Sequence, residues 1–326
     1  MTNRNVNLDL IKCIACFAVV GLHAVGMNNY TIYYLCGCGV PLFFMVNGYL
    51  LFSKEQLPYT YIFRKILQIL KIVLLWNLLI ALPVLVIRHK IVNPLTLSFS
   101  SLLQKGYLWH FWFFGALLLL YLILPPLHKL FHKKRGIHVL TVILCFFLCL
   151  SMSITSMVKG YPLHAYIPQS LRLWTWLFYF AAGGLFAHFG TKLFKFPLLL
   201  HTAFMICAAL LNNRSLKHIG LYFTQSRIAD YYYDYLSSVI YYLLLFTLLL
   251  RIPLKQAAHK AIAFLSSLTM GIFILHPIFL MGINAFYTPD NKTAAIILWV
   301  LLTFASALVA FIMSKLPLIK ELIKLS

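Results

Sequence analysis

Long apolar segments recur along the whole chain and restrict its fold more than any other feature. Ten of them approach the length of about 20 residues that an α-helix needs to cross a ~30 Å hydrocarbon layer. Of the 326 residues, 62% are hydrophobic and 10% are charged, whereas about a quarter of the residues in soluble domains are charged. We therefore predict an all-α polytopic membrane protein, with about ten transmembrane helices in a single bundle and one domain over residues 1–326. The predicted spans are residues 8–27, 34–52, 66–87, 109–127, 138–157, 172–190, 195–212, 236–251, 262–284 and 293–314.

The distribution of basic residues predicts how the chain is oriented. Of the 27 Lys and Arg residues, Lys12 and Lys71 lie inside predicted spans. If the N-terminus is cytoplasmic, sixteen of the others face the cytoplasm and nine face the outside of the cell. Basic residues favour the cytoplasmic side, so both termini are expected in the cytoplasm of a cell (inner or plasma) membrane. The net charge of +21 is then explained by topology and contact with anionic membrane lipids, and no nucleic-acid partner is expected.

Lys12 and His23 lie in the first apolar segment, where a cation or a titratable group is costly unless a partner or a function holds it. Eleven residues are three helical turns plus about 20°, so both side chains project from nearly the same face, roughly 16 Å apart along the axis. Two interpretations are open for each residue. Lys12 either pairs with Asp9 or binds an anionic group. His23 is either satisfied by a neighbouring helix or acts as a general base.

Other polar residues lie inside or at the ends of apolar segments. His276 is 14 residues beyond the start of the ninth segment and His23 is 15 beyond the start of the first, so the two are expected at similar depth in one buried polar site. His110 opens the fourth segment, where on its own it is typical of an interfacial aromatic belt. Asn47 lies inside the second segment and needs hydrogen-bond partners, and its neighbour Gly48 is a candidate position for close helix packing.

Two further residue classes are expected to be structural. The tyrosines at positions 231–233 and 235 lie near Asp230 and Asp234 in the long connection 213–235, where an interfacial belt is the commoner explanation and a platform for sugar rings is the alternative. The seven cysteines lie in or at the edges of apolar segments and are expected as free thiols. The chain has no metal-ligand spacing and no Gly-rich phosphate loop, so no metal is expected. From these residues alone, an enzyme and a transporter or flippase that uses His23 and His276 as a proton relay remain open.

Four motifs distinguish between these classes. They are Leu8-Asp9 with Lys12-x10-His23, residues 40–50, residues 110–113 followed by Tyr121 and Leu124-Pro125, and residues 271–277. In this order they resemble the integral-membrane acyltransferase-3 family, and the resemblance covers the whole chain. Asn47 departs from the family pattern, which usually has Ser before the glycine.

The resemblance implies an O-acyltransferase of surface polysaccharides in its short, stand-alone form, without an appended extracytoplasmic hydrolase-like domain. It would move an acetyl or similar acyl group from cytoplasmic acetyl-CoA, or a related acyl-CoA, to a hydroxyl of a cell-surface carbohydrate or its lipid-linked precursor. By the family pattern, His23 is the general base or acyl relay, and Lys12 helps to hold the CoA. The remaining candidates for the substrate site are Asp9, Asn47, His110, Trp112 and His276.

Overall fold

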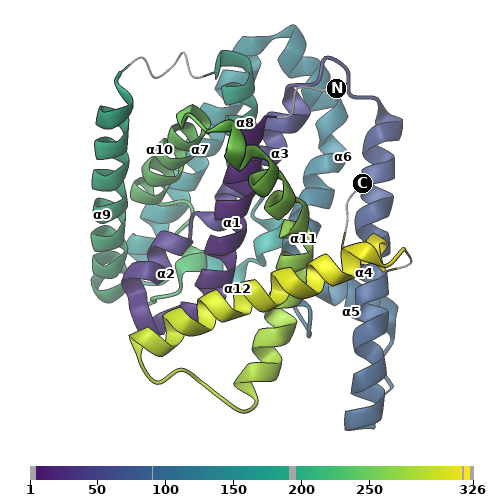
Figure 1. Ribbon diagram of the computed structural model, residues 1–326. Coiled ribbons are helices and arrows are strands. Elements are labelled where there is room, and N and C mark those ends of the chain that lie inside the picture. Colours follow the sequence, from purple (N-terminus) through teal and green to yellow (C-terminus); the bar gives the residue numbers. More distant parts are fainter. Residues whose placement is uncertain (1–4, 90, 191–195, 318, 324–326) are drawn as a thin grey trace.

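The computed structural model describes residues 5–89, 91–190, 196–317 and 319–323, and every regular element in these ranges is a helix (Figure 1). The predicted all-α fold is therefore confirmed. The α-helices are α1 (Val6–Val25), α2 (Tyr30–Cys36), α3 (Gly39–Phe52), α4 (Tyr59–Arg88), α5 (Pro94–Leu102), α6 (Trp112–Lys133), α7 (Arg135–Lys159), α8 (Leu173–Phe189), α9 (Leu198–Tyr222), α10 (Leu236–Arg251), α11 (Gln256–Asn284) and α12 (Lys292–Lys315). Short 3-10 helices lie between or after them: η1 (Gly26–Asn29), η2 (Trp109–Phe111), η3 (Leu163–Tyr166), η4 (Gln169–Leu171), η6 (Ala229–Tyr231) and η7 (Lys320–Leu322).

Helix α1 lies in the middle of the bundle, packed against α3, α10, α11 and α12 (Figure 1). Asn5 caps its start by accepting hydrogen bonds from backbone N–H groups of the first turn. It ends at Gly26, whose φ of 48° lies in the left-handed region that favours glycine. The Asn7 side chain donates two hydrogen bonds of 2.8 Å, to the carbonyl oxygens of Leu249 and Ile252. These bonds fix the start of α1 against the end of α10.

The bundle has two ends. At the lysine end, α1 begins near Lys12 and α3 ends near Lys54, and both residues line one cavity. At the loop end, α1 ends just after His23 and the connections that contain η2, η3, η4 and η6 gather. The second half of α9 reaches the same end, because the Asn213 side chain donates to the carbonyl oxygen of Thr31 at 2.7 Å. Every candidate site residue can be placed relative to these two ends.

Helices α3 and α8 approach each other closely at two glycines. A Cβ atom on Gly48 would overlap the carbonyl group of Phe180, and one on Gly183 would overlap the carbonyl group of Met45. The two backbones are therefore in direct contact, and a larger residue at either glycine would push the helices apart. Small residues are a common means of close helix contact in a membrane. The predicted packing role of Gly48 is confirmed.

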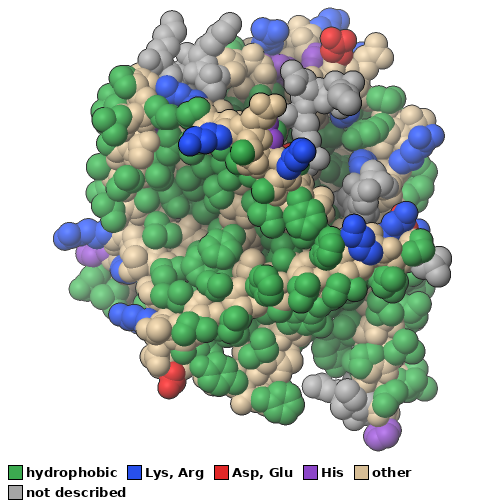
Figure 2. All heavy atoms as spheres, viewed as in Figure 1, with side chains coloured by type: hydrophobic (Ala, Val, Ile, Leu, Met, Phe, Trp, Pro, Cys, Tyr) green, Lys and Arg blue, Asp and Glu red, His purple; other side chains and the backbone are tan. Residues whose placement is uncertain are grey.

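The outer surface of the bundle is strongly apolar. Large side chains such as Leu144, Phe147 and Phe304 are each more than half exposed. Figure 2 shows hydrophobic side chains over the middle of one face, with Lys and Arg mainly around its margins. Water exposure of such a surface would cost about 25 cal/mol per Å². The exposed surface is therefore that of a multi-pass membrane protein.

The number of about ten spans is not confirmed. Six stretches of the described chain are long and apolar enough to cross a membrane: Val6–Phe52, Tyr59–Val86, Trp109–Lys133, Arg135–Lys159, Gln256–Asn284 and Lys292–Lys315. Each of the ten predicted segments lies largely on a helix. Three of these helices are short, however: α3, α8 and α10 have 14, 17 and 16 residues, fewer than the ~20 that a perpendicular span needs.

We predict that the lysine end faces the cytoplasm. Arg135 follows the end of α6, and His128 near that end bonds to the carbonyl oxygen of Lys54 at 2.9 Å, so Arg135 lies at the lysine end. Arg214 lies near the loop end. In intact cells, a membrane-impermeant maleimide should label Arg214→Cys, and it should label Arg135→Cys only after permeabilisation.

The background for this experiment is Cys207→Ser. All seven cysteines are free, as predicted, and Cys207 is the exposed one. If Arg135→Cys were labelled in intact cells and Arg214→Cys were protected, the lysine end would face outward and the predicted orientation would be wrong.

Candidate active site

Three histidines from α1, η2 and α11 meet near the loop end. The ring centroid of His23 lies 5.3 Å from that of His276, with 27° between the planes, and His276 lies 6.2 Å from His110. The predicted common depth of His23 and His276 is confirmed. His110 is only 2% exposed, so it joins this histidine cluster instead of a belt at the lipid interface.

Helix α11 holds His276 in a defined orientation. The Nδ1 atom lies 2.9 Å from the carbonyl oxygen of Ile272. A carbonyl oxygen only accepts hydrogen bonds, so Nδ1 carries the proton and Nε2 keeps its lone pair. Nε2 is buried and makes no hydrogen bond to the described residues. His276 therefore contributes one basic nitrogen to the cluster.

His23 is the accessible member of the histidine cluster. His110 and His276 are buried, whereas His23 is half-buried in the last turn of α1. The indole of Trp109 meets the His23 ring edge-on, with 5.1 Å between the ring centroids. A molecule that approaches the cluster from outside the protein can reach His23 more readily than the other two imidazoles.

A cavity of about 400 Å³ lies on the lysine side of the cluster. Residues of α1, α3, α4, α6 and α11 line it, including Lys12, Lys54 and Lys65. Its volume falls within the 300–1,000 Å³ that is usual for small-molecule sites. Three cationic side chains in one cavity indicate a ligand with negative charge.

Lys12 is held by Asp9 and still lines this cavity. Its Nζ atom lies 3.4 Å from Oδ1 of Asp9, and the Ser266 hydroxyl donates to the same oxygen at 2.8 Å. The Asp9 carboxylate is buried, whereas the Lys12 side chain remains 29% exposed. The interpretation of Lys12 as the partner of Asp9 is confirmed. An ammonium group has three N–H donors, so this contact does not prevent Lys12 from binding a ligand as well.

Lys54 and Lys65 flank an aromatic ring at the same end. Their Nζ atoms lie 4.9 and 5.8 Å from the ring centroid of Tyr61. Both distances are within reach of a cation–π interaction, which holds the two ammonium groups near each other. The lysine end of the cavity thus combines positive charge with a flat aromatic surface.

The cavity becomes aromatic toward the histidine cluster. On α11, Ser266 lies at the lysine end and Phe273 is seven residues further along, roughly 10 Å closer to the cluster. On α3 the lining residues run from Leu51 back to Phe43, with Lys54 just beyond the end of the helix, and Phe113 comes from the first turn of α6. The described lining of the cavity includes these phenylalanines and none of the three histidines.

Asn47 lies on the wall of the cavity with both ends of its amide satisfied. Its Nδ2 donates to the carbonyl oxygen of Phe43 at 2.9 Å, and its Oδ1 accepts from the Tyr121 hydroxyl at 3.3 Å. The half-buried amide thus has the partners that its position requires. Asn47 joins α3 to α6 through the cavity wall.

Trp112 lies in a different environment from the other candidates. Its ring stacks on Trp176 with 5.1 Å between centroids. Trp109, which the sequence did not single out, makes the contact with His23. Trp109 lies in the 3-10 turn η2 and Trp112 directly follows it. Spacing along a continuous α-helix could therefore not predict which of the two faces the cluster.

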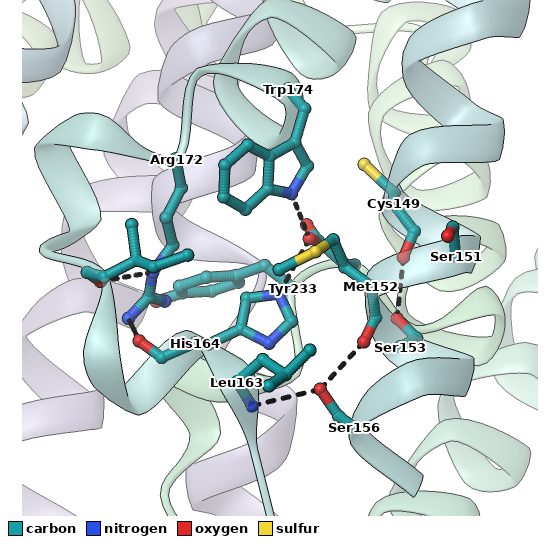
Figure 3. Close-up of polar contacts among 12 residues, drawn as sticks. Cys149, Ser151, Met152, Ser153, Ser156, Leu163, His164, Arg172, Trp174 and Tyr233 are labelled. Carbon is teal, nitrogen blue, oxygen red and sulfur yellow. Dashed lines mark hydrogen bonds and ion pairs between the residues drawn. The ribbon is translucent and has the colours of Figure 1, made fainter. Parts of the chain in front are cut away.

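A second polar network ties the loop-end segments together (Figure 3). Nε2 of His164 and Nε1 of Trp174 both contact Oδ2 of Asp234, at 2.8 and 2.7 Å. Arg172 donates to three backbone carbonyl oxygens, among them those of His164 and Asp230. His164, Arg172 and Asp234 are all buried. The network therefore fixes η3, η6 and the start of α8 relative to one another.

The tyrosine cluster is internal. Tyr232, Tyr233 and Tyr235 are at most 2% exposed, so both the lipid-facing belt and the open sugar platform are wrong for these three residues. The Tyr233 hydroxyl and Gln169 Nε2 donate to the two oxygens of Asp230, at 3.0 and 2.9 Å. Burial, with the Asp230 charge nearby, raises the pKa of Tyr233 well above its usual value. The phenol therefore stays protonated and acts as a donor.

The family model of acyltransferase-3, described as an acyltransferase domain, matches residues 5–315. The chain belongs to the acyltransferase-3 family. It is a membrane acyltransferase, as the motif resemblance implied. No curated protein and no solved structure matches the chain.

Lys12 and His23, the two residues of the first-helix motif, lie in the two parts of the site of this acyltransferase. Lys12 lines the cavity and His23 belongs to the histidine cluster. Sequence reasoning missed Lys54 and Lys65, although both lie on the same expected side of the membrane as Lys12 and flank Tyr61. That grouping of basic residues around an aromatic residue was the available signal.

We expect Asp234→Asn to destabilise the acyltransferase. Its carboxylate is buried with His164 and Trp174 as partners, and a hydrogen bond to a charged group contributes about 1.5–3 kcal/mol. The melting temperature of purified protein in detergent should fall by several degrees. Asp290→Asn, at an exposed carboxylate, is the control and should leave it unchanged. Equal melting temperatures for the two variants would contradict a structural role for this network.

Proposed function

We propose that this acyltransferase moves an acetyl or similar short acyl group from cytoplasmic acyl-CoA to a hydroxyl of a cell-surface carbohydrate or its lipid-linked precursor. The observation that carries the proposal is the arrangement on α1, where Lys12 lines a three-lysine cavity and His23 belongs to the histidine cluster. Membership of an acyltransferase family favours transfer over transport by a proton relay.

The donor would bind in the cavity with its anionic part at the lysine end. CoA carries phosphate groups, and Lys12, Lys54 and Lys65 supply the positive charge there. Tyr61, between two of these lysines, offers a flat ring to the base of the nucleotide. Charge-assisted hydrogen bonds of this kind are roughly twice as strong as neutral ones. The thioester end would then point along the cavity toward the histidines.

The transfer itself needs a base or an acyl relay. As a base, His23 takes the proton of the acceptor hydroxyl while the hydroxyl oxygen attacks the thioester carbonyl carbon. The new C–O bond forms, the C–S bond breaks, and the imidazolium returns the proton to the leaving sulfur, so that CoA leaves as the thiol. As a relay, His23 first accepts the acyl group and then passes it to that oxygen. An imidazole suits both roles because it exchanges a proton near neutral pH. His276, with Nδ1 bonded to Ile272, would orient the neighbouring ring.

The acceptor would approach from the loop end, where His23 is partly exposed. Asp230 is a half-buried carboxylate at this end, held by Tyr233 and Gln169. Carboxylates accept hydrogen bonds from hydroxyl groups. Asp230 is therefore our candidate for holding a neighbouring sugar hydroxyl.

Donor binding gives a direct test of Lys12. We expect Lys12→Ala to weaken acetyl-CoA binding by about 10- to 150-fold, because a charge-assisted hydrogen bond contributes about 1.5–3 kcal/mol. Lys12→Arg should keep most of the affinity, since it retains the charge. Calorimetry on purified protein measures both. Lys129→Ala, an exposed lysine outside the cavity lining, is the control. Unchanged affinity in folded Lys12→Ala would limit Lys12 to its contact with Asp9.

The chemistry is tested at His23. We expect His23→Gln to reduce acetyl transfer by 10²–10⁴-fold, the usual effect of losing a general base, while acetyl-CoA still binds. The O-acetyl content of surface polysaccharide in a deletion strain of the native host, complemented with each variant, measures the loss. His218→Gln, an exposed histidine on α9, is the control. Near-normal acetylation with His23→Gln at matched protein levels would remove His23 from the mechanism.

A further inference from the structure

The aromatic end of the cavity is closed by two phenylalanine rings. Phe273 lines the cavity and lies with its ring centroid 5.5 Å from that of His110 and 6.3 Å from that of His276. Phe113 also lines the cavity, and its ring lies 5.5 Å from that of Phe273. Because the described lining includes both rings and no histidine, these rings separate the cavity from the histidine cluster.

Neighbouring rings hold this pair in place. Phe113 packs against Phe44 at 5.0 Å and Phe43 at 6.0 Å, and Phe273 packs against Phe114 at 5.5 Å. Phe113 and Phe273 are only 7% and 8% exposed. Closely packed interiors resist the insertion of extra atoms. The two rings therefore form a wall that leaves little free space at this end, and a longer acyl chain would have to displace packed side chains.

The direction of the donor decides what meets this wall. If the phosphates of an acyl-CoA occupy the lysine end, the last carbon of the acyl chain is the most distant part of the molecule and reaches the rings first. An acetyl group has one carbon beyond its carbonyl. Each further methylene would have to enter between Phe113 and Phe273.

We propose that Phe113 and Phe273 form a size filter between the cavity and the histidine cluster, and that this filter restricts the donor to short acyl groups. The inference rests on the proposed function, because it takes an acyl-CoA as the ligand of the cavity. It assigns to these two residues a role in donor specificity that is separate from the charge recognition by the lysines.

The test compares acyl chain lengths in variants that shorten one ring. Phe273→Leu and Phe113→Leu each remove part of the wall and keep an apolar side chain. A buried methylene that finds space is worth about 0.8 kcal/mol, or roughly fourfold in affinity. Propionyl-CoA, with one more methylene than acetyl-CoA, should therefore gain roughly fourfold in affinity relative to acetyl-CoA in either variant. Wild-type protein should prefer acetyl-CoA. Calorimetry on purified protein in detergent gives the dissociation constants.

The controls separate this inference from the proposed function. Phe264→Leu changes an exposed ring of the same helix outside the cavity lining and should leave the preference unchanged. Two leucine variants keep the test available if one of them does not fold. An unchanged ratio of the two dissociation constants in a folded variant that still binds acetyl-CoA overturns the size filter alone. Failure of wild-type protein to bind acetyl-CoA overturns the proposed donor and the filter together.

Discussion

A polar group inside the hydrocarbon layer must find its partners within the protein, and α1 places such groups at two levels. Asp9 near its start is satisfied by Lys12 and by Ser266 of α11. His23 near its end lies against His276 of the same partner helix. The separation is eleven residues from Lys12 to His23 and ten from Ser266 to His276. Because these separations are nearly equal, two parallel helices can make both contacts at once, which fixes α11 beside α1.

The close contact of α3 and α8 positions one wall of the cavity. Gly48 and Gly183 allow the two backbones to touch, and Asn47 and Phe43 of α3 line the cavity. At the loop end, Arg172 and the Asp234–His164 pair hold the irregular segments that carry Asp230. The site is therefore built between regular helices, and a polar network fixes the irregular segments at its loop end.

Hydrophobic segment length and helical spacing were sufficient to predict the all-α fold, the common face of Lys12 and His23, and the meeting of His23 with His276. They could not determine how many helices span the membrane, because α8 and α10 are short helices packed within the bundle. Trp109, and not Trp112, lies beside His23 because of the 3-10 turn of η2. Spacing along a regular α-helix does not describe such a turn. The burial of Tyr232, Tyr233 and Tyr235 likewise depends on tertiary packing, since a tyrosine-rich segment has the same composition at a membrane interface and inside a protein.

We propose that the lysine cavity and the histidine cluster are two parts of one acyl-transfer site. A cryo-EM structure of the protein in a nanodisc, with a bound antibody fragment and acetyl-CoA, would test this. We expect CoA phosphate density beside Lys12, Lys54 and Lys65, with the acetyl group against Phe113 and Phe273 on the cavity side of the histidines. Acetyl-CoA density at the loop end, with the cavity empty, would contradict it.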